Sequence, residues 1–438
     1  MKKILSCIII GLLISCSFGV QGLIFENSSE EPITTNLGDV FFNLKMKVFM
    51  KLGHLPSLSA CIIDGNEVIW SKGYGFYDLE NRKPATDNTI YNIASISKTV
   101  TGTALMQLWE QDLFDLDEDV NNFLPFNLRN PNFPDIPITF RMLLSHSSSL
   151  NPETGISQFR DYIWSNFSAD PPFSFFPMPW LEQFLIPGGQ WYKSNRWSSI
   201  YKPGEYTMYS NVNFDVTCYL VERISGEIFV EYCKNHIFQP LEMYNTSFNL
   251  SELDINNVAI PYHYHNGEYL QINELSYLLG EDITPPDKYW RVRCYAAGGL
   301  YTTVSDLSHF LIAHMNGGIW NDVRILEERT VEEMHTIQPP GNIDPVGNLY
   351  HGLAWTIQGT PFDVNISGHN GGNIGVVGYM SFIPSEEIGI ICFYNSDYIF
   401  ETNTISLLID TSLIPMSLFK KGGFNFISHI DLGNIGAG

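Results

Sequence analysis

Runs of apolar and β-branched residues lie near both ends of the chain, and the stretch between them consists of helical patterns and loops. The run SLSACIIDGNEVIWSKGYGFYD carries Asp64-Gly65, a typical hairpin turn, between two such runs. Two further strands are expected at 376–383 and 388–394, joined by a turn at Pro384-Ser385. This order predicts an α+β fold. We expect both chain ends to build one antiparallel sheet flanked by helices, with an inserted, mainly helical subdomain and a cleft between the two.

Apolar residues recur at helical spacing in several segments. We expect helices at 41–51, 95–111, 217–225 and 305–315, and the last apolar run, 405–418, is expected to be helical up to Pro415. Proline and glycine interrupt the stretch from 115 to 295. One domain is therefore expected over residues 41–415. A flexible lead-in over 23–40 precedes it and a glycine-rich tail over 416–438 follows it.

The balance of charge excludes several classes of partner. The 438 residues include 47 acidic and 24 basic side chains, which give a net charge of −23. Such a chain repels phosphate backbones and anionic lipid headgroups, so we expect neither nucleic-acid binding nor basic-patch membrane binding. The sequence also has no H-E-x-x-H motif and no metal-like cysteine spacing. No metal or cofactor is expected, and the expected partner is a small-molecule or peptide substrate; the sequence predicts no oligomeric state.

The first 22 residues, MKKILSCIIIGLLISCSFGVQG, place two lysines before an apolar stretch that is shorter than a membrane-spanning helix. This pattern is typical of a secretory signal peptide, so we expect a secreted or cell-surface protein. The residues before Cys16 also resemble a bacterial lipoprotein box, which would attach a lipid to Cys16; the alternative is that Cys16 is an ordinary residue of the signal. Five cysteines follow it and are expected to be buried free thiols, with one disulfide as the alternative.

Ser95-Ile96-Ser97-Lys98 is an S-x-x-K motif at the start of the helix expected at 95–111. Positions i and i+3 share one helix face, so the amine of Lys98 can reach the hydroxyl of Ser95 and accept its proton. A serine at a helix N-terminus also offers its own N–H to a developing oxyanion. Residues 199–202 and 417–420 match the motif too, but they do not open a long apolar helix. The alternative for Ser95 is a simple helix N-cap.

Two further polar motifs are candidates for the same site. Tyr209-Ser210-Asn211 follows the turn at 202–205 and is expected on a loop. A tyrosine beside a lysine amine can share its proton and act as a second general acid or base, and Asn211 can bind the lysine and a substrate amide. His369-Asn370-Gly371-Gly372 precedes the strand expected at 376–383, and its glycines allow close approach of a substrate. The alternatives are a surface tyrosine and a glycine-rich turn with an incidental histidine.

S-x-x-K, Y-x-N and H-x-G in this order resemble the motifs of the serine β-lactamase and penicillin-binding-protein superfamily. The chain looks closest to the branch of class C β-lactamases, D-Ala-D-Ala carboxypeptidases, D-aminopeptidases and related esterases. Five segments agree with this resemblance, which covers roughly residues 41–400: YNIASISKTVTGTALMQLWEQDLFDLDEDV, ITFRMLLSHSSSL, KPGEYTMYSNVNFDVTCYLVERISG, AAGGLYTTVSDLSHF and YHGLAW.

The resemblance implies a β-lactamase/transpeptidase-like fold and two-step acyl transfer through a serine ester, on an ester or amide substrate. It implies three catalytic residues, namely Ser95 as nucleophile, Lys98 as its proton partner and Tyr209 as general acid or base. It also implies four substrate-binding residues, which are Asn211, His369, Gly371 and Gly372. His369 stands where many relatives have the lysine of K-T-G, and the backbone N–H groups of Ser95 and Gly372 would form the oxyanion hole.

Three positions depart from the pattern of the superfamily. His369 is mostly neutral at pH 7, whereas a lysine is a permanent cation that can anchor a substrate carboxylate. We therefore expect β-lactams and D-Ala-terminated peptides to be poor substrates. Ser149 replaces a usual glycine and Tyr301 a usual serine, which we expect to shift local turns only. The alternative functions are a non-catalytic binding or sensor protein on the same scaffold, and a structural lipoprotein of the cell surface.

Overall fold

The computed structural model describes residues 37–152, 179–274, 289, 295–344, 349–359, 364–397 and 414–423. The chain divides into two units, residues 1–44 and 45–438, and apart from the first residues of α2 the structure discussed below lies in the second. The expected signal peptide, Cys16 and the lead-in up to residue 36 fall outside the described residues. Within the described ranges, no helix combines the length and the apolar character needed to cross a membrane.

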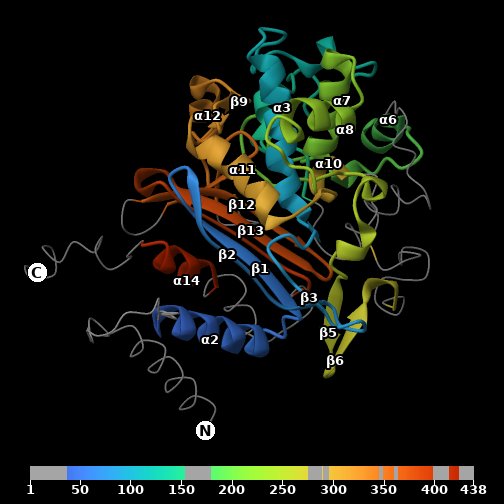
Figure 1. The fold of residues 1–438 in the computed structure, drawn as a ribbon. Helices are drawn as coiled ribbons and strands as arrows, with labels where there is room; N and C mark the ends of the chain where they lie inside the picture. The colour runs from blue at the N-terminus through green and yellow to red at the C-terminus, as the bar shows by residue number, and fades with distance from the viewer. Residues whose placement is uncertain are drawn as a thin grey trace, which may run out of the picture. The chain divides into compact units, whose positions relative to one another are not determined.

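One eight-stranded antiparallel sheet joins the two ends of the chain, as predicted (Figure 1). β1 (Ser57–Asp64) and β2 (Glu67–Asp78) form the expected hairpin, and β14 (Ile388–Tyr394) pairs with the other edge of β1. The strands expected at 376–383 and 388–394 are confirmed residue for residue. The sheet order is β10 (Tyr350–His351), β11 (Thr356–Gly359), β12 (Asn365–Asn373), β13 (Val376–Ile383), β14, β1, β2 and β3 (Lys83–Pro84).

The central strands are buried on both faces because helices cover both. All of β1 except Asp64 is buried, in keeping with its nearly continuous apolar sequence. α11 (Val304–Met315) packs against β14 and β1 on the face of Gly389, where a Cβ would lie 2.9 Å from Met315 Sδ. The neighbouring residue Ile388 points to the other face, where it meets the end of α14 (Ile414–Lys421).

α14 corrects two predictions about the end of the chain. The helix was expected to stop at Pro415, and a tail was expected from residue 416. Instead Pro415 is the second residue of α14, which continues to Lys421 and packs on the sheet. A proline is compatible with the first turn of a helix because the N–H that it lacks would have no partner there.

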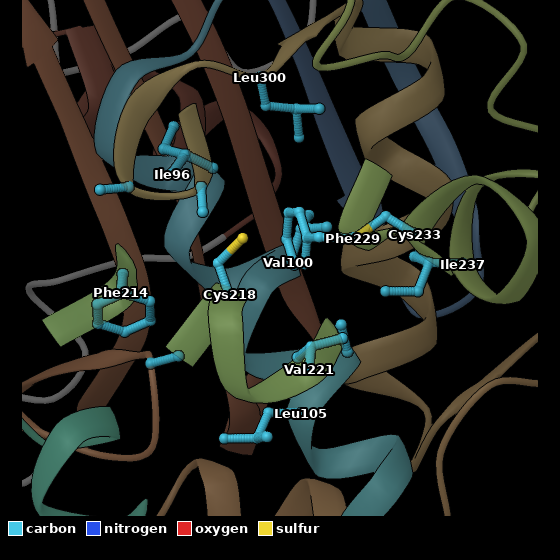
Figure 2. Close-up of a cluster of buried hydrophobic side chains, with 14 of the residues drawn as sticks. Ile96, Val100, Leu105, Phe214, Cys218, Val221, Phe229, Cys233, Ile237 and Leu300 are labelled. Atoms are coloured by element: carbon cyan, nitrogen blue, oxygen red, sulfur yellow. The ribbon is translucent and has the colours of Figure 1, made fainter. Parts of the chain in front are cut away.

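The inserted region is built around α3 (Ser97–Trp109), whose residues from Ser97 to Leu108 are all buried. Figure 2 shows Val100 and Leu105 of α3 among the side chains of Phe214, Cys218 and Val221 from α7 (Val212–Ser225). α3 is two residues shorter at each end than expected, and α7 begins five residues earlier than expected. A helix buried on all sides is held rigidly, which suits a residue that must be placed precisely.

The remaining helices and strands include two segments for which the sequence made a prediction. The expected helix at 305–315 is confirmed as α11, whereas α2 (Leu37–Leu52) begins inside the range that was expected to be flexible. The other helices and strands named in Figure 1 are α6 (Pro179–Leu185), α8 (Phe229–Cys233), α10 (Tyr295–Gly298), α12 (Glu328–Met334), β5 (Tyr262–His265), β6 (Glu268–Gln271) and β9 (Val323–Arg324). The shorter pieces are α4 (Phe140–Leu144), β4 (Tyr91–Asn92), β7 (Tyr301–Thr302) and β8 (Ile319–Trp320).

Four of the cysteines lie in described residues, and all four are buried free thiols, as expected. They are Cys61, Cys218, Cys233 and Cys392. Burial raises the pKa of the Cys61 thiol well above its ordinary value, which makes it unreactive at neutral pH. Cys294 lies outside the described residues.

Candidate active site

The candidate nucleophile lies in a tight turn just before α3. Ser95 is the middle residue of the 3-10 turn η1 (Ala94–Ile96) and is half-buried. The preceding Ala94 has a φ of +45°, which is unusual for a residue with a side chain. Its N–H donates to Asn92 Oδ1 over 3.1 Å, and its carbonyl accepts from Ser97 Oγ over 2.6 Å. These bonds fix the strained turn that presents Ser95.

The H-N-G-G motif lies inside strand β12, where the sequence suggested a turn or a segment ahead of the strand. Gly371 faces the turn of Ser95 so closely that a Cβ there would lie 2.1 Å from the carbonyl oxygen of Ile93. The residue opposite Gly371 on β13 is Gly378, where a Cβ would lie 3.0 Å from Ile96 Cδ1. The paired glycines therefore let the nucleophile turn rest directly on the sheet.

Lys98 places its amine beside the hydroxyl of Ser95. The Nζ atom lies 3.0 Å from Ser95 Oγ and 2.5 Å from the carbonyl oxygen of Ala297 in α10. The Lys98 side chain is 0% exposed. Its Nζ also lies 5.0 Å from the ring centre of Tyr209 and 5.8 Å from that of Phe214. The predicted contact between Ser95 and Lys98 is therefore present, although Ser95 lies in η1 and not in α3, which it was expected to open.

Tyr209 reaches Lys98 because its loop is bonded to His146. The N–H of Met208 donates to the His146 carbonyl over 2.8 Å, and the N–H of Ser210 donates to His146 Nδ1 over 3.2 Å. The rings of His146 and Tyr209 lie 4.4 Å apart. Asn211 ends this loop as the residue before α7. The loop placement predicted for the Y-x-N motif is confirmed.

His369 joins this group from β12. Its ring centre lies 6.1 Å from that of Tyr209, and its side chain is 4% exposed. Nδ1 lies 2.7 Å from the carbonyl oxygen of Asn370, so Nδ1 carries the proton and Nε2 is left as an acceptor. Burial, reinforced by the positive charge of Lys98, lowers the pKa of His369 to about 3. The ring is therefore neutral throughout the physiological range.

Three residues of this cluster were not among the predicted site residues. His146 and His351 pack beside Tyr209, and Asp344 binds His351. Burial, together with the charges of His351 and Lys98, holds the pKa of His146 well below its ordinary value. Both histidines occur in segments that carried the family resemblance, ITFRMLLSHSSSL and YHGLAW, so the signal was present. No local spacing linked them to Tyr209.

The structure thus brings four predicted residues together, namely Ser95, Lys98, Tyr209 and His369. Gly371 lies directly against the nucleophile turn, and Gly372 follows it on β12 with an exposed backbone. The roles of Asn211 in binding substrate and of the Ser95 and Gly372 N–H groups as an oxyanion hole stay predictions. Within the described residues, no group of three or more histidine, cysteine or carboxylate side chains is arranged to hold a metal ion.

Comparison with known proteins now places this geometry in a family. The model of the beta-lactamase family matches residues 42–408. The chain belongs to the beta-lactamase family. Its fold resembles the octameric penicillin-binding protein homologue from Pyrococcus abyssi, with a TM-score of 0.67 and 26% identity over 88% of this chain and 77% of that one. The resemblance to the serine β-lactamase and penicillin-binding-protein superfamily is therefore confirmed.

Two curated relatives match a smaller share of this beta-lactamase family member. Protein flp of Staphylococcus aureus (strain MRSA252) is 25% identical over 55% of this chain and 48% of its own length. Penicillin-binding protein 4* of Bacillus subtilis (strain 168) is 20% identical over 74% of this chain and 65% of its own length. The chain thus spans about half the length of flp.

Ser149, where the resemblance implies a glycine, has a φ of +67° in the left-handed region. Glycine adopts this conformation without strain, so the structure fits that expectation. Here Ser149 Oγ accepts a hydrogen bond from Asn130 Nδ2 over 2.9 Å, which holds the strained residue in place.

Proposed function

We propose that the protein is a serine hydrolase that transfers an acyl group from an ester or amide to Ser95 and then to water. The observation that carries this proposal is the 3.0 Å contact between Lys98 Nζ and Ser95 Oγ, made by a completely buried amine. A hydroxyl becomes an effective nucleophile when a base within hydrogen-bond distance takes its proton. Tyr209, whose ring centre lies 5.0 Å from the same amine, supplies a second group that can hold this proton.

The proposed reaction has two half-reactions. In the first, Ser95 Oγ attacks the substrate carbonyl, its proton passes to the Lys98–Tyr209 pair, and the leaving group takes that proton as it departs. In the second, a water molecule loses a proton to the same pair and attacks the ester on Ser95. Collapse of the tetrahedral intermediate returns the proton to Ser95 Oγ and releases the acid.

The neutral ring of His369 is a reason to expect weak binding of substrates that place a carboxylate beside it. Its ring is neutral, and its free nitrogen accepts hydrogen bonds because Nδ1 donates to the backbone. A carboxylate is acceptor-only, so it gains nothing from Nε2, whereas a substrate N–H or O–H can bind there. We therefore propose that uncharged esters or amides are the better substrates, and that β-lactams, which carry such a carboxylate, are poor ones.

Steady-state hydrolysis of p-nitrophenyl esters, D-amino-acid amides and nitrocefin tests this function. We expect ester turnover with a kcat/KM at least ~100-fold above that for nitrocefin, and loss of turnover in Ser95→Ala by at least ~10³-fold. Ser199→Ala is the matched control, because Ser199 belongs to an equivalent S-x-x-K motif but is exposed on the surface. It should retain wild-type rates.

The outcomes separate the enzyme from its alternative. Efficient nitrocefin hydrolysis would refute the substrate preference while leaving the nucleophile in place. Turnover that survives in Ser95→Ala would exclude Ser95 as nucleophile. Purified protein that binds these compounds without Ser95-dependent turnover would favour a binding or sensor protein on the beta-lactamase scaffold.

A further inference from the structure

A buried histidine–carboxylate pair lies beside Tyr209 and has no role in the mechanism above. His351 Nε2 lies 3.0 Å from Asp344 Oδ2, and the two side chains are 4% and 0% exposed. A carboxylate only accepts hydrogen bonds, so His351 donates from Nε2 to Asp344. Asp344 therefore fixes the orientation of the His351 ring.

The His351 ring packs beside Tyr209, so its orientation limits the positions that the tyrosine ring can take. Its centre lies 6.2 Å from that of Tyr209 and 5.0 Å from that of His146. His146 is itself 4.4 Å from Tyr209, so the three rings form one packed cluster. Rotation of His351 would remove one wall of the space that Tyr209 occupies.

The segment that carries this pair also holds the backbone of the Tyr209 loop. Asn342 Oδ1 accepts the N–H of Thr207 over 2.9 Å, and Asn342 Nδ2 donates to the Thr207 carbonyl over 3.4 Å. The same segment thus acts on Tyr209 at two points. Asn342 makes an uncharged contact with the backbone, whereas Asp344 contacts His351, whose ring packs beside that of Tyr209.

The charged and titratable side chains around Tyr209 come from four elements. Lys98 approaches from α3, His146 from the segment after α4, His369 from β12, and His351 with Asp344 from β10 and the segment before it. Burial keeps His146 and His369 neutral near pH 7. Asp344 brings a carboxylate to this group through its 3.0 Å contact with His351.

We propose that Asp344, acting through His351, is a positioning residue for Tyr209 that also strengthens the Tyr209–Lys98 pair as a proton acceptor. The orientation comes from the hydrogen bond between Asp344 and His351. The added proton affinity comes from the carboxylate, because a nearby negative charge stabilises the protonated form of an acceptor. This inference rests on the proposed acylation of Ser95.

The rate at which a fluorophosphonate probe labels Ser95, measured from pH 5 to pH 9, tests the role of Asp344. In this reaction Ser95 Oγ attacks phosphorus, fluoride leaves, and the Tyr209–Lys98 pair takes the proton. In Asp344→Asn we expect the maximal rate to fall about 10-fold and the acid limb of the profile to move about one pH unit lower. Asp344→Glu, which keeps the charge, should restore the limb.

Asn342→Ala is the matched control for a purely structural effect. It removes the backbone contact without changing charge, so labelling should slow equally at every pH while the acid limb stays in place. Thermal unfolding of each variant confirms that the compared proteins are folded. If Asp344→Asn does not fold, His351→Gln replaces it: its amide can still donate to Asp344, so we expect a lower maximal rate with an unmoved limb.

Several results would overturn the proposal. An acid limb that coincides in Asp344→Asn and the wild type contradicts the electrostatic role, as does a limb that moves to higher pH. If the acid limb moves equally in Asn342→Ala, the shift comes from the structure of the loop and not from the charge of Asp344. A wild-type profile in His351→Gln would show that Asp344 does not act on Tyr209 through His351. Absence of Ser95 labelling in the wild type overturns the proposed function and this inference together, which distinguishes that failure from the others.

Discussion

Replacing Lys98 with methionine is expected to lower ester turnover by at least ~10³-fold without lowering the stability of the fold. Methionine matches the length of the lysine stem but cannot accept the proton of Ser95, so the nucleophile loses its base. The double variant of Ser95→Ala and Lys98→Met should be no less active than either single variant, because the two residues act as one unit. The measurement is kcat/KM for a p-nitrophenyl ester.

The stability of the Lys98→Met variant distinguishes a catalytic role of Lys98 from a structural one. Lys98 is completely buried, and burying its polar amine costs free energy that the apolar methionine avoids. The substitution leaves the Ala297 carbonyl without its lysine donor, which costs about 1–3 kcal/mol. We expect the free energy of unfolding in urea to be unchanged or raised. A large loss of stability would show that Lys98 serves the fold, and retained turnover would exclude it as the base.

Replacing Gly102 with alanine is expected to destabilise the protein by about 3 kcal/mol. Gly102 lies in the middle of α3, and a Cβ there would lie 2.2 Å from the Cβ of Ala354. Ala354 cannot withdraw, because its N–H is bonded to the carbonyl of Leu144 over 2.9 Å and its side chain is buried. The free energy of unfolding in urea measures the effect.

The double variant of Gly102→Ala and Ala354→Gly should reverse this loss. With Ala354 reduced to glycine, the new Cβ meets Ala354 Cα at 3.7 Å, which is an ordinary contact. Ala354 has a φ of +67°, a conformation that glycine adopts without strain, and alanine is about 1 kcal/mol better than glycine inside a helix. The double variant should match or exceed wild-type stability. Additive losses would show that the two sites do not share this contact.

The strands near the two ends of the chain were predictable because their local sequence patterns agree with the structure that they form. The hairpin around Gly65 and the strands β13 and β14 combine β-branched runs with clear turns. β12 was missed because HNGGN reads as a turn in isolation. Its glycines are required by the close approach of η1, which is a tertiary contact that local sequence does not encode. α14 was cut short because Pro415 suggested an end to the helix, whereas it lies in the first turn.

Some residues of the candidate site could be predicted from the sequence, whereas others could not. Ser95 and Lys98 are three residues apart on one helical face, so their contact follows from local geometry, and the family resemblance added Tyr209 and His369. The pairing of Asp344 with His351 joins residues seven positions apart, but its place beside Tyr209 depends on how two distant segments pack. Only the three-dimensional structure reveals such a group.

Mass spectrometry of protein quenched during hydrolysis of a p-nitrophenyl ester shows whether Ser95 carries the acyl group during turnover. We predict one acyl group for each chain, located on the peptide that contains Ser95, which disappears when the ester is exhausted. Ser95→Ala should carry none under the same conditions. An acyl group on another residue, or full turnover with no covalent adduct at any time, would exclude Ser95 as the residue that carries the acyl group.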